Sequence, residues 1–175
     1  IGGATSYAGG GTLPRYLRST IQSFPNPNTY LIAETNEAAK WRSAFGPAIG
    51  ICWRSGKAGG ERALQYAPLE TWAAFVRDYP GSVVSVQYDA AVDEIAQLEN
   101  LSGKKIIVPN GIDQKNELDR TCALLSSLDA VVSAPTAVSW LAAAAGVQTY
   151  KILYDTSWTS FGETCEPFGP ACICV

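Results

Sequence analysis

Two spacings of apolar residues alternate along most of the chain after Pro47. Short apolar runs are followed by segments in which apolar residues recur every three or four positions. Runs of the first kind predict buried strands, and the longer spacing predicts amphipathic helices. The strands expected on this basis are 49–53, 82–88, 104–108, 130–133 and 148–153.

Turn and cap residues mark the helices expected around these strands. A helix over 34–45 ends at Gly46, and Pro68 opens another at its first position. Asp89 and Asn116 are the expected N-caps of two further helices. A last helix follows Pro135 and Thr136, with an apolar face formed by Val138, Leu141, Ala142 and Ala145.

Strands that alternate with helices in this rhythm predict right-handed βαβ units. The expected fold is therefore α/β, a Rossmann-like parallel sheet with helices on both faces. Residues 1–30, rich in Gly, Ser, Thr, Pro and Asn, are expected to be the remnant of a preceding domain or a linker. Residues 31–47 are expected to form a linker helix, and 48–175 the Rossmann-like domain.

Composition narrows the classes of function. The net charge is −3 and the sequence has no basic stripe, which argues against a nucleic-acid partner. No run of about 18 apolar residues predicts a membrane span, and the first residues do not resemble a secretion signal. The chain contains no Met, which suggests a piece of a longer protein. We expect a cytoplasmic location.

The sequence also lacks His, which removes Ser-His-Asp and Cys-His catalysis and HExxH zinc sites. A general base must be a carboxylate or come from elsewhere. Of the five cysteines, Cys52 and Cys122 lie in apolar segments and are expected in the core. The other three are Cys165, Cys172 and Cys174, near the end of the chain. They allow a disulfide or a soft-metal site, but their spacing is not that of paired CxxC ligands, so reduced thiols on a terminal strand are favoured.

The passage from the strand at 130–133 into the last helix is the clearest candidate for ligand binding. A strand that turns at once into a helix points free backbone N–H groups beyond its carboxyl end, and the helix dipole adds positive potential there. Thr136 offers a hydroxyl, and Ala137 leaves the backbone of the junction accessible. We expect this junction, including Val138, to face phosphate.

A glycine-containing loop after the first strand is the second candidate. It carries Arg54, Ser55, Lys57 and Arg62 among several glycines that allow an anion close to the backbone. It matches neither a Walker A nor a GxGxxG string, which argues against NAD. A solvated flexible loop is the alternative. Parallel strands end at the same edge of a sheet, so this loop and the Thr136 junction are expected across one crevice.

Two further segments follow the second and third expected strands, where a Rossmann-like half holds a ribose and a base. They are Gln87, Tyr88 and Asp89, and Pro109, Asn110 and Gly111. Turn formation is the simpler interpretation of Asn110-Gly111, and the two roles are compatible. The five tryptophans are mostly expected in the core or between domains, although Trp140, one turn into the last helix, is placed to line the crevice.

Four segments in order, IGICWRSG, SVVSVQYD, KKIIVPNG and LDAVVSAPTAVSWLAAAAGVQTYKIL, resemble the C-terminal half of family 9 glycosyltransferases. These include the ADP-heptose:lipopolysaccharide heptosyltransferases and related domains attached to tetratricopeptide repeats, whose linker resembles YLIAETNEAAKWRSAFG. The resemblance covers roughly residues 28–160. It implies the C-terminal half of a GT-B fold, which holds the nucleotide-sugar donor without a cofactor or metal.

Carried over by position, the resemblance implies phosphate contacts for the loop after the first strand and for Thr136 and Ala137. It places Gln87–Asp89 near the ribose and 109–111 near the base. Heptosyltransferases usually have Asp at the position of Pro135 and His at that of Trp140, both in the neighbourhood of the donor sugar, so heptose is not implied here. The family's general base belongs to the N-terminal domain.

The function expected is therefore transfer of a sugar from a nucleotide diphosphate donor to an acceptor hydroxyl by the full-length protein. The parent protein is expected to supply an N-terminal domain or tetratricopeptide repeats, and the acceptor is a carbohydrate, a lipid-linked molecule or a protein. A degenerate transferase that acts as a binding or scaffold module is the alternative. A hydrolase or isomerase is disfavoured by the absence of His and of a nucleophile elbow.

Overall fold

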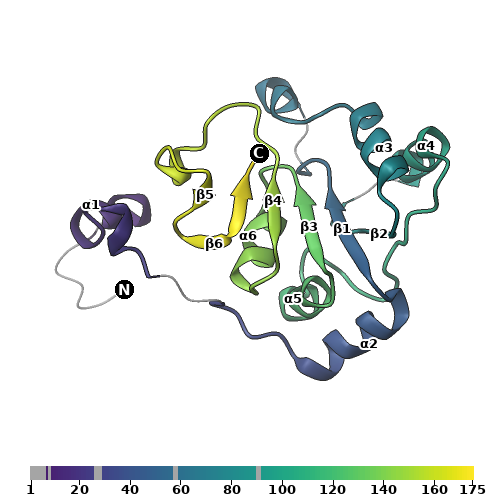
Figure 1. Cartoon of the computed structure of the whole chain (residues 1–175), viewed down its shortest axis with the longest axis horizontal. Helices are drawn as coiled ribbons and strands as arrows, with labels where there is room; N and C mark the ends of the chain where they lie inside the picture. Colours follow the sequence, from purple (N-terminus) through teal and green to yellow (C-terminus); the bar gives the residue numbers. More distant parts are fainter. Residues whose placement is uncertain (1–6, 8, 26–28, 57–58, 90–91) are drawn as a thin grey trace.

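A computed structural model describes residue 7 and residues 9–25, 29–56, 59–89 and 92–175. Its centre is a six-stranded sheet with the order β2-β1-β3-β4-β6-β5 (Figure 1). All neighbouring pairs are parallel except β5 and β6, which are antiparallel. The strands are β1 (Ala48–Cys52), β2 (Ser82–Ser85), β3 (Ala130–Ser133), β4 (Thr149–Lys151), β5 (Cys165–Glu166) and β6 (Gly169–Cys174).

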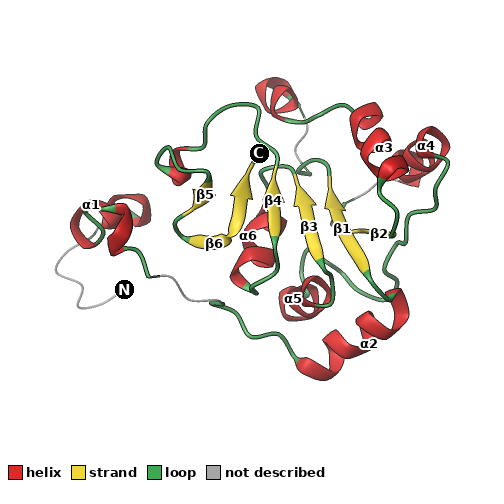
Figure 2. Cartoon of the chain, viewed as in Figure 1, coloured by secondary structure: helices red, strands yellow, loops and turns green. Residues whose placement is uncertain are grey.

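Helices flank the sheet (Figure 2). Those packed on its two faces are α3 (Leu69–Asp78), α4 (Val92–Ser102), α5 (Leu118–Ser126) and α6 (Ala137–Ala144), whereas α2 (Thr35–Phe45) packs on α5 and α1 (Leu13–Leu17) lies apart from the sheet. Short 3-10 turns are η1 (Gly10–Thr12), η2 (Ile21–Ser23), η3 (Gly60–Gln65) and η4 (Trp158–Ser160). The expected α/β fold with a mostly parallel Rossmann-like sheet is confirmed.

The alternating side-chain directions of β1 divide the core into two layers. Ile49 and Ile51 pack with residues of α3 and α4, whereas Ala48 and Cys52 pack with residues of α5 and α6. Successive side chains of a strand point to opposite faces, so a strand buried on both faces must be apolar throughout. Gly50 lies between Ala48 and Cys52 in the sequence, and a Cβ there would come within 2.8 Å of Leu128 Cδ1, so a larger residue would force Leu128 to shift.

The linker helix expected over 31–47 is α2, and it packs on α5. Arg42 Nη1 donates to Asp129 Oδ1 at 2.7 Å, and Arg120 Nη2 lies 3.2 Å from Glu37 Oε1. Trp41 and Phe45 stack on each other and pack against the core. Gly46 ends the helix with φ of +65°, a backbone conformation that glycine adopts without strain. The division into three segments stays a prediction.

Two local expectations are wrong. Residues 104–108 form a single parallel bridge, Val84 to Ile107, rather than a strand. Asn116 lies in the turn before α5, whose N-cap is Glu117. Asp89 binds Arg54 and Gln87. Its expected role as the N-cap of α4 stays a prediction, because residues 90–91 lie outside the described residues.

The end of the chain adds β5 and β6, which no periodicity predicted. Cys172 and Cys174 lie on β6 and Cys165 on β5, and all five cysteines, which fall within the described residues, are free thiols. Phe24, from the segment before α2, packs edge-on against Phe168 with ring centroids 5.0 Å apart. The expected strand at the end of the chain is present, and the reduced state of its thiols stays a prediction.

The order in which strands are added to the sheet reverses at β1. After β1 the chain adds β2 on one side, and it later returns to add β3 on the other side. Open α/β sheets bind ligands in the crevice where the strand order reverses, at the carboxyl ends of the strands. The fold therefore points to the segments that follow β1 and β3.

Candidate functional site

The β3–α6 junction has the local geometry expected of a helix N-terminus. Thr136 is the N-cap, with extended backbone angles and a side chain that accepts a hydrogen bond from the backbone N–H of Val138 at 3.3 Å. Thr136 is buried, and Ala137 next to it is exposed. The first N–H groups of a helix have no partner within it, so this end of α6 presents donors and positive potential.

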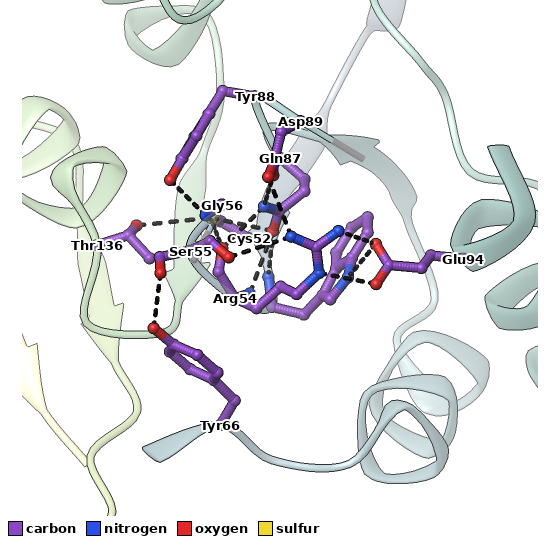
Figure 3. A network of polar contacts seen from close by, with 11 residues as sticks. Cys52, Arg54, Ser55, Gly56, Tyr66, Gln87, Tyr88, Asp89, Glu94 and Thr136 are labelled. Carbon is purple, nitrogen blue, oxygen red and sulfur yellow. Dashed lines mark hydrogen bonds and ion pairs between the residues drawn. The ribbon is translucent and has the colours of Figure 1, made fainter. Parts of the chain in front are cut away.

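The segments after β1 and β3 are adjacent, as expected. Cys52 pairs with Ser133 in the sheet, and the backbone N–H of Ala134 donates to the carbonyl of Cys52 at 2.7 Å. Cys52 Sγ lies 3.5 Å from Thr136 Oγ1 (Figure 3). Burial raises the pKa of the Cys52 thiol to about 11, so the thiol stays protonated at neutral pH.

The side chain of Gln87 hydrogen-bonds to the backbone at the start of the loop after β1. Its carbonyl oxygen accepts hydrogen bonds from the backbone N–H groups of Trp53 and Arg54, each at 3.1 Å. Its amide nitrogen donates to the carbonyl of Arg54 at 2.8 Å and to Asp89 Oδ1 at 2.6 Å. Gln87 is only 3% exposed, so its side chain shapes the site instead of facing solvent.

Arg54 is held by two carboxylates (Figure 3). Its Nε and Nη2 donate to the two oxygens of Glu94 at 2.7 and 2.6 Å, and its Nη1 donates to Asp89 Oδ2 at 3.1 Å. The hydrogen bonds to Glu94, followed by those to Asp89, raise the pKa of Arg54 above its usual value. The guanidinium charge is thus compensated within the loop.

Two tyrosines hold the start of the glycine-containing loop. The backbone N–H of Gly56 donates to the Tyr88 hydroxyl at 2.7 Å, and the Tyr66 hydroxyl donates to Ser55 Oγ at 2.8 Å. The structure therefore brings Arg54, Ser55 and the 87–89 segment together. Lys57, also expected here, lies outside the described residues.

The other expected site residues flank this centre. Residues 109–111 follow the bridge beside β2, so they lie at the same edge of the sheet, but both β2 and β1 separate that bridge from β3. Gly111 has φ of +74°, as its expected role in a turn requires. Pro135 precedes the Thr136 cap. Trp140, on α6, is half-buried, and Lys151 Nζ lies 4.7 Å from its ring centroid.

Glu94 and Tyr66 are the participants that the sequence analysis missed. Glu94 comes from the first turn of α4, and its Oε2 also accepts from Trp53 Nε1 at 3.3 Å. Tyr66 follows η3, which had no helical periodicity. An acidic residue in the first turn of a helix is common for reasons of the helix dipole alone, so the sequence carried no specific signal for Glu94.

Two features are absent from the described residues. No His, Cys, Asp and Glu side chains there gather in a group of three or more that would hold a metal ion. No described helix has the length and apolar character required to cross a membrane.

Comparison with solved structures places this arrangement in a known fold. E. coli ADP-heptose lipopolysaccharide heptosyltransferase II matches 91% of this chain with a TM-score of 0.61 and 16% sequence identity. A family 9 glycosyltransferase from Veillonella parvula matches 83% with a TM-score of 0.56 and 16% identity. The fold is that of a family 9 glycosyltransferase. The chain spans 49% and 41% of those two proteins, respectively, so it corresponds to about half of the family 9 fold.

A third family 9 fold extends the comparison. E. coli heptosyltransferase WaaC, solved with ADP-2-deoxy-2-fluoro heptose, matches 79% of this chain and 40% of its own, with a TM-score of 0.52 and 16% identity. Among curated proteins, FlbA of Caulobacter vibrioides is 34% identical over 164 residues, which are 90% of this chain and 27% of FlbA. No protein-family model matches the sequence.

Proposed function

We propose that this chain is the C-terminal, donor-binding half of a glycosyltransferase that transfers a sugar from a nucleotide diphosphate donor to an acceptor hydroxyl. The proposal rests on the contact between Cys52, at the end of β1 before the Ser55 loop, and Thr136 at the start of α6. This contact lies at the reversal of strand order in a family 9 fold. The WaaC structure was solved with a nucleotide-sugar analogue, which supports the choice of ligand class.

The diphosphate binds at the N-terminus of α6. Arg54 is compensated by Glu94 and Asp89, so the attraction comes from the helix dipole and the backbone N–H groups near Ala137. Such fixed dipoles also stabilise the charge that develops on the leaving diphosphate, and the transfer then requires no metal ion. The nucleoside extends toward Gln87–Asp89.

The general base comes from the remainder of the parent protein. This chain contains no His, and it spans about half of the family 9 structures that it matches. The isolated chain therefore binds the donor without efficient transfer. An N-terminal domain or tetratricopeptide repeats are the expected source of the missing part.

One observation favours a second candidate, a binding or scaffold module that has lost donor chemistry. Arg54, one of the charged residues expected to contact phosphate, is paired with two carboxylates, so its charge is compensated within the described residues. A thermal-shift panel of nucleoside diphosphates and nucleotide sugars separates the two candidates, because a ligand that binds the native state raises its melting temperature. Stabilisation by a member of the panel supports the transferase, and a flat panel supports the scaffold.

The charge-reversing substitution Ala137→Glu tests the position of the diphosphate. Ala137 is exposed at the first position of α6, where a carboxylate is favourable to the helix but repels a bound anion. We expect the affinity for the stabilising nucleoside diphosphate, measured by calorimetry, to fall at least about fivefold. Ala39→Glu on α2, also exposed, is the matched control and should leave the affinity unchanged. Equal affinities of the two variants would place the diphosphate elsewhere.

A further inference from the structure

A hollow of about 330 Å³ lies beside the N-terminus of α6. Pro135 forms part of its wall, one residue before the Thr136 cap, and the loop 153–158 after β4 forms most of the rest. Gln65, at the end of η3, also lines it. We call it the β4-loop hollow. Since β4 is the neighbour of β3, the hollow continues the carboxyl edge of the sheet beyond the candidate diphosphate position.

Two exposed aromatic side chains border the β4-loop hollow. Tyr154 is 77% exposed and Trp158 is 70% exposed, so Trp158 is not one of the core tryptophans. Exposed rings cost free energy in water unless they serve a contact, and their faces attract the slightly positive C–H groups of a ligand. Large exposed aromatics around a hollow therefore point to a binding surface.

Polar groups complete the lining of this hollow. Asp155, Thr156 and Ser157 lie on the same loop between the two aromatic residues. A carboxylate accepts hydrogen bonds, whereas hydroxyl groups both donate and accept. A pyranose ring presents C–H groups on its faces and hydroxyl groups around its edge, so aromatic faces with acceptors between them match its chemistry.

The volume restricts the ligand further. Ligand pockets measure about 300–1,000 Å³, and the β4-loop hollow is at the lower end of that range. It suits one sugar ring better than a whole nucleotide sugar. The order of segments along the edge agrees with this restriction: Gln87–Asp89 follow β2, Arg54 and Ser55 follow β1, Thr136 follows β3, and the loop 153–158 follows β4. Nucleoside, diphosphate and sugar have the same order in a donor.

Another hollow of this chain has a different composition. A second hollow, of about 450 Å³, lies over the sheet and is lined by apolar and aromatic side chains, among them Val132, Tyr150 and Ile152. The β4-loop hollow differs because a carboxylate and hydroxyls separate its aromatic residues. Its chemistry therefore favours a sugar over an apolar protein surface.

We propose that the β4-loop hollow is a pyranose subsite in which Tyr154 and Trp158 contact the ring faces and Asp155 accepts hydroxyl hydrogen bonds. If the bound sugar is that of the nucleotide-sugar donor, the subsite rests on the proposed function. A sugar of the acceptor would be bound by the same contacts, but it would come from the second substrate.

The donor source is tested with Trp158→Ala, Tyr154→Ala and Asp155→Asn in the whole chain. Calorimetry compares each nucleotide sugar of a panel with its own nucleoside diphosphate. We expect the aromatic variants to bind the nucleotide sugar about five- to tenfold more weakly and to bind the nucleoside diphosphate as the wild type does. Tyr30→Ala, an exposed aromatic whose backbone contacts Ala144 at the other end of α6, is the matched control.

The acceptor source is tested by saturation-transfer NMR with methyl glucoside, methyl galactoside and N-acetylglucosamine, with and without nucleoside diphosphate. A signal that Trp158→Ala and Tyr154→Ala abolish and Tyr30→Ala retains supports the subsite with an acceptor sugar. If the wild type binds no nucleotide, the proposed function fails, and this arm alone decides the subsite. Aromatic variants that match the wild type in both arms overturn the subsite and leave a protein contact as the use of these rings.

Discussion

Arg54 and Glu94 form a bidentate ion pair, with Arg54 Nε 2.7 Å from Glu94 Oε1 and Nη2 2.6 Å from Oε2. The parallel N–H groups of a guanidinium match the two oxygens of a carboxylate, which makes such pairs strong and directional. The pair converts the arginine that was expected to meet phosphate into a residue that positions the loop after β1.

Glu94→Gln should release part of the Arg54 charge. We expect the free energy of unfolding to fall by about 1–3 kcal/mol, because a charged hydrogen-bond partner is lost. The affinity for a nucleoside diphosphate should nevertheless rise about two- to fivefold, since one fewer carboxylate faces the ligand. Urea unfolding and calorimetry measure the two quantities. Glu70→Gln, on the exposed side of α3, controls for the loss of charge, and an affinity that falls with stability would contradict the prediction.

Gln87→Met preserves the shape of a buried side chain and removes its polar atoms. The backbone N–H groups of Trp53 and Arg54 would lose their acceptor, and Asp89 would lose a donor. We expect a loss of about 2–3 kcal/mol in the free energy of unfolding, measured in urea. Gln148→Met is the control at an exposed glutamine and should stay within about 0.5 kcal/mol of the wild type. A Gln87 variant as stable as this control would show that the network does not hold the loop.

Lys151 and Glu166 form an ion pair in which both side chains are almost completely buried. Removing one partner leaves a buried charge without compensation, so Lys151→Met and Glu166→Leu should each cost about 3–5 kcal/mol. The double substitution removes both charges and should cost less than either single one. Chemical unfolding of the four proteins forms a double-mutant cycle, and additive losses would mean that the two groups are not coupled.

The free energy of unfolding should fall at alkaline pH, because two buried thiols have a higher pKa in the folded protein than in the unfolded chain. Burial raises the pKa of Cys52 and of Cys172 to about 11 from a usual value of 9.0. Below pH 9 both thiols are protonated in the folded and the unfolded chain, and their contribution is fully present. Between pH 9 and 11 the unfolded chain loses these protons first, so stability decreases by up to about 2–3 kcal/mol for each thiol.

Cys52→Ala and Cys172→Ala isolate this effect from other alkaline titrations. Each variant should start less stable at pH 8 and show a shallower loss between pH 9 and 11 than the wild type does. The measurement is the denaturant midpoint as a function of pH. Parallel curves for wild type and variants would mean that these thiols ionise as easily in the folded protein as in the unfolded chain.

Local signals were sufficient for much of the fold. The run IGIC became β1, and Thr136 became the cap of α6, because an apolar run and an N-cap act over a few neighbouring residues. The adjacency of the Cys52 and Thr136 ends also followed, since parallel strands end at one edge of the sheet. Residues 104–108 show the limit of such signals, because an apolar run does not by itself provide strand partners.

The sequence by itself determined the α/β class, the order of most elements and the edge of the sheet at which the candidate site lies. Only the tertiary structure decided how the charges are used. Arg54 and Glu94 are 40 residues apart, and Lys151 and Glu166 meet through β4 and the β5–β6 hairpin. Periodicity reports which face of an element is apolar, whereas an ion pair depends on where two elements come to lie, and that is set by packing of the whole core.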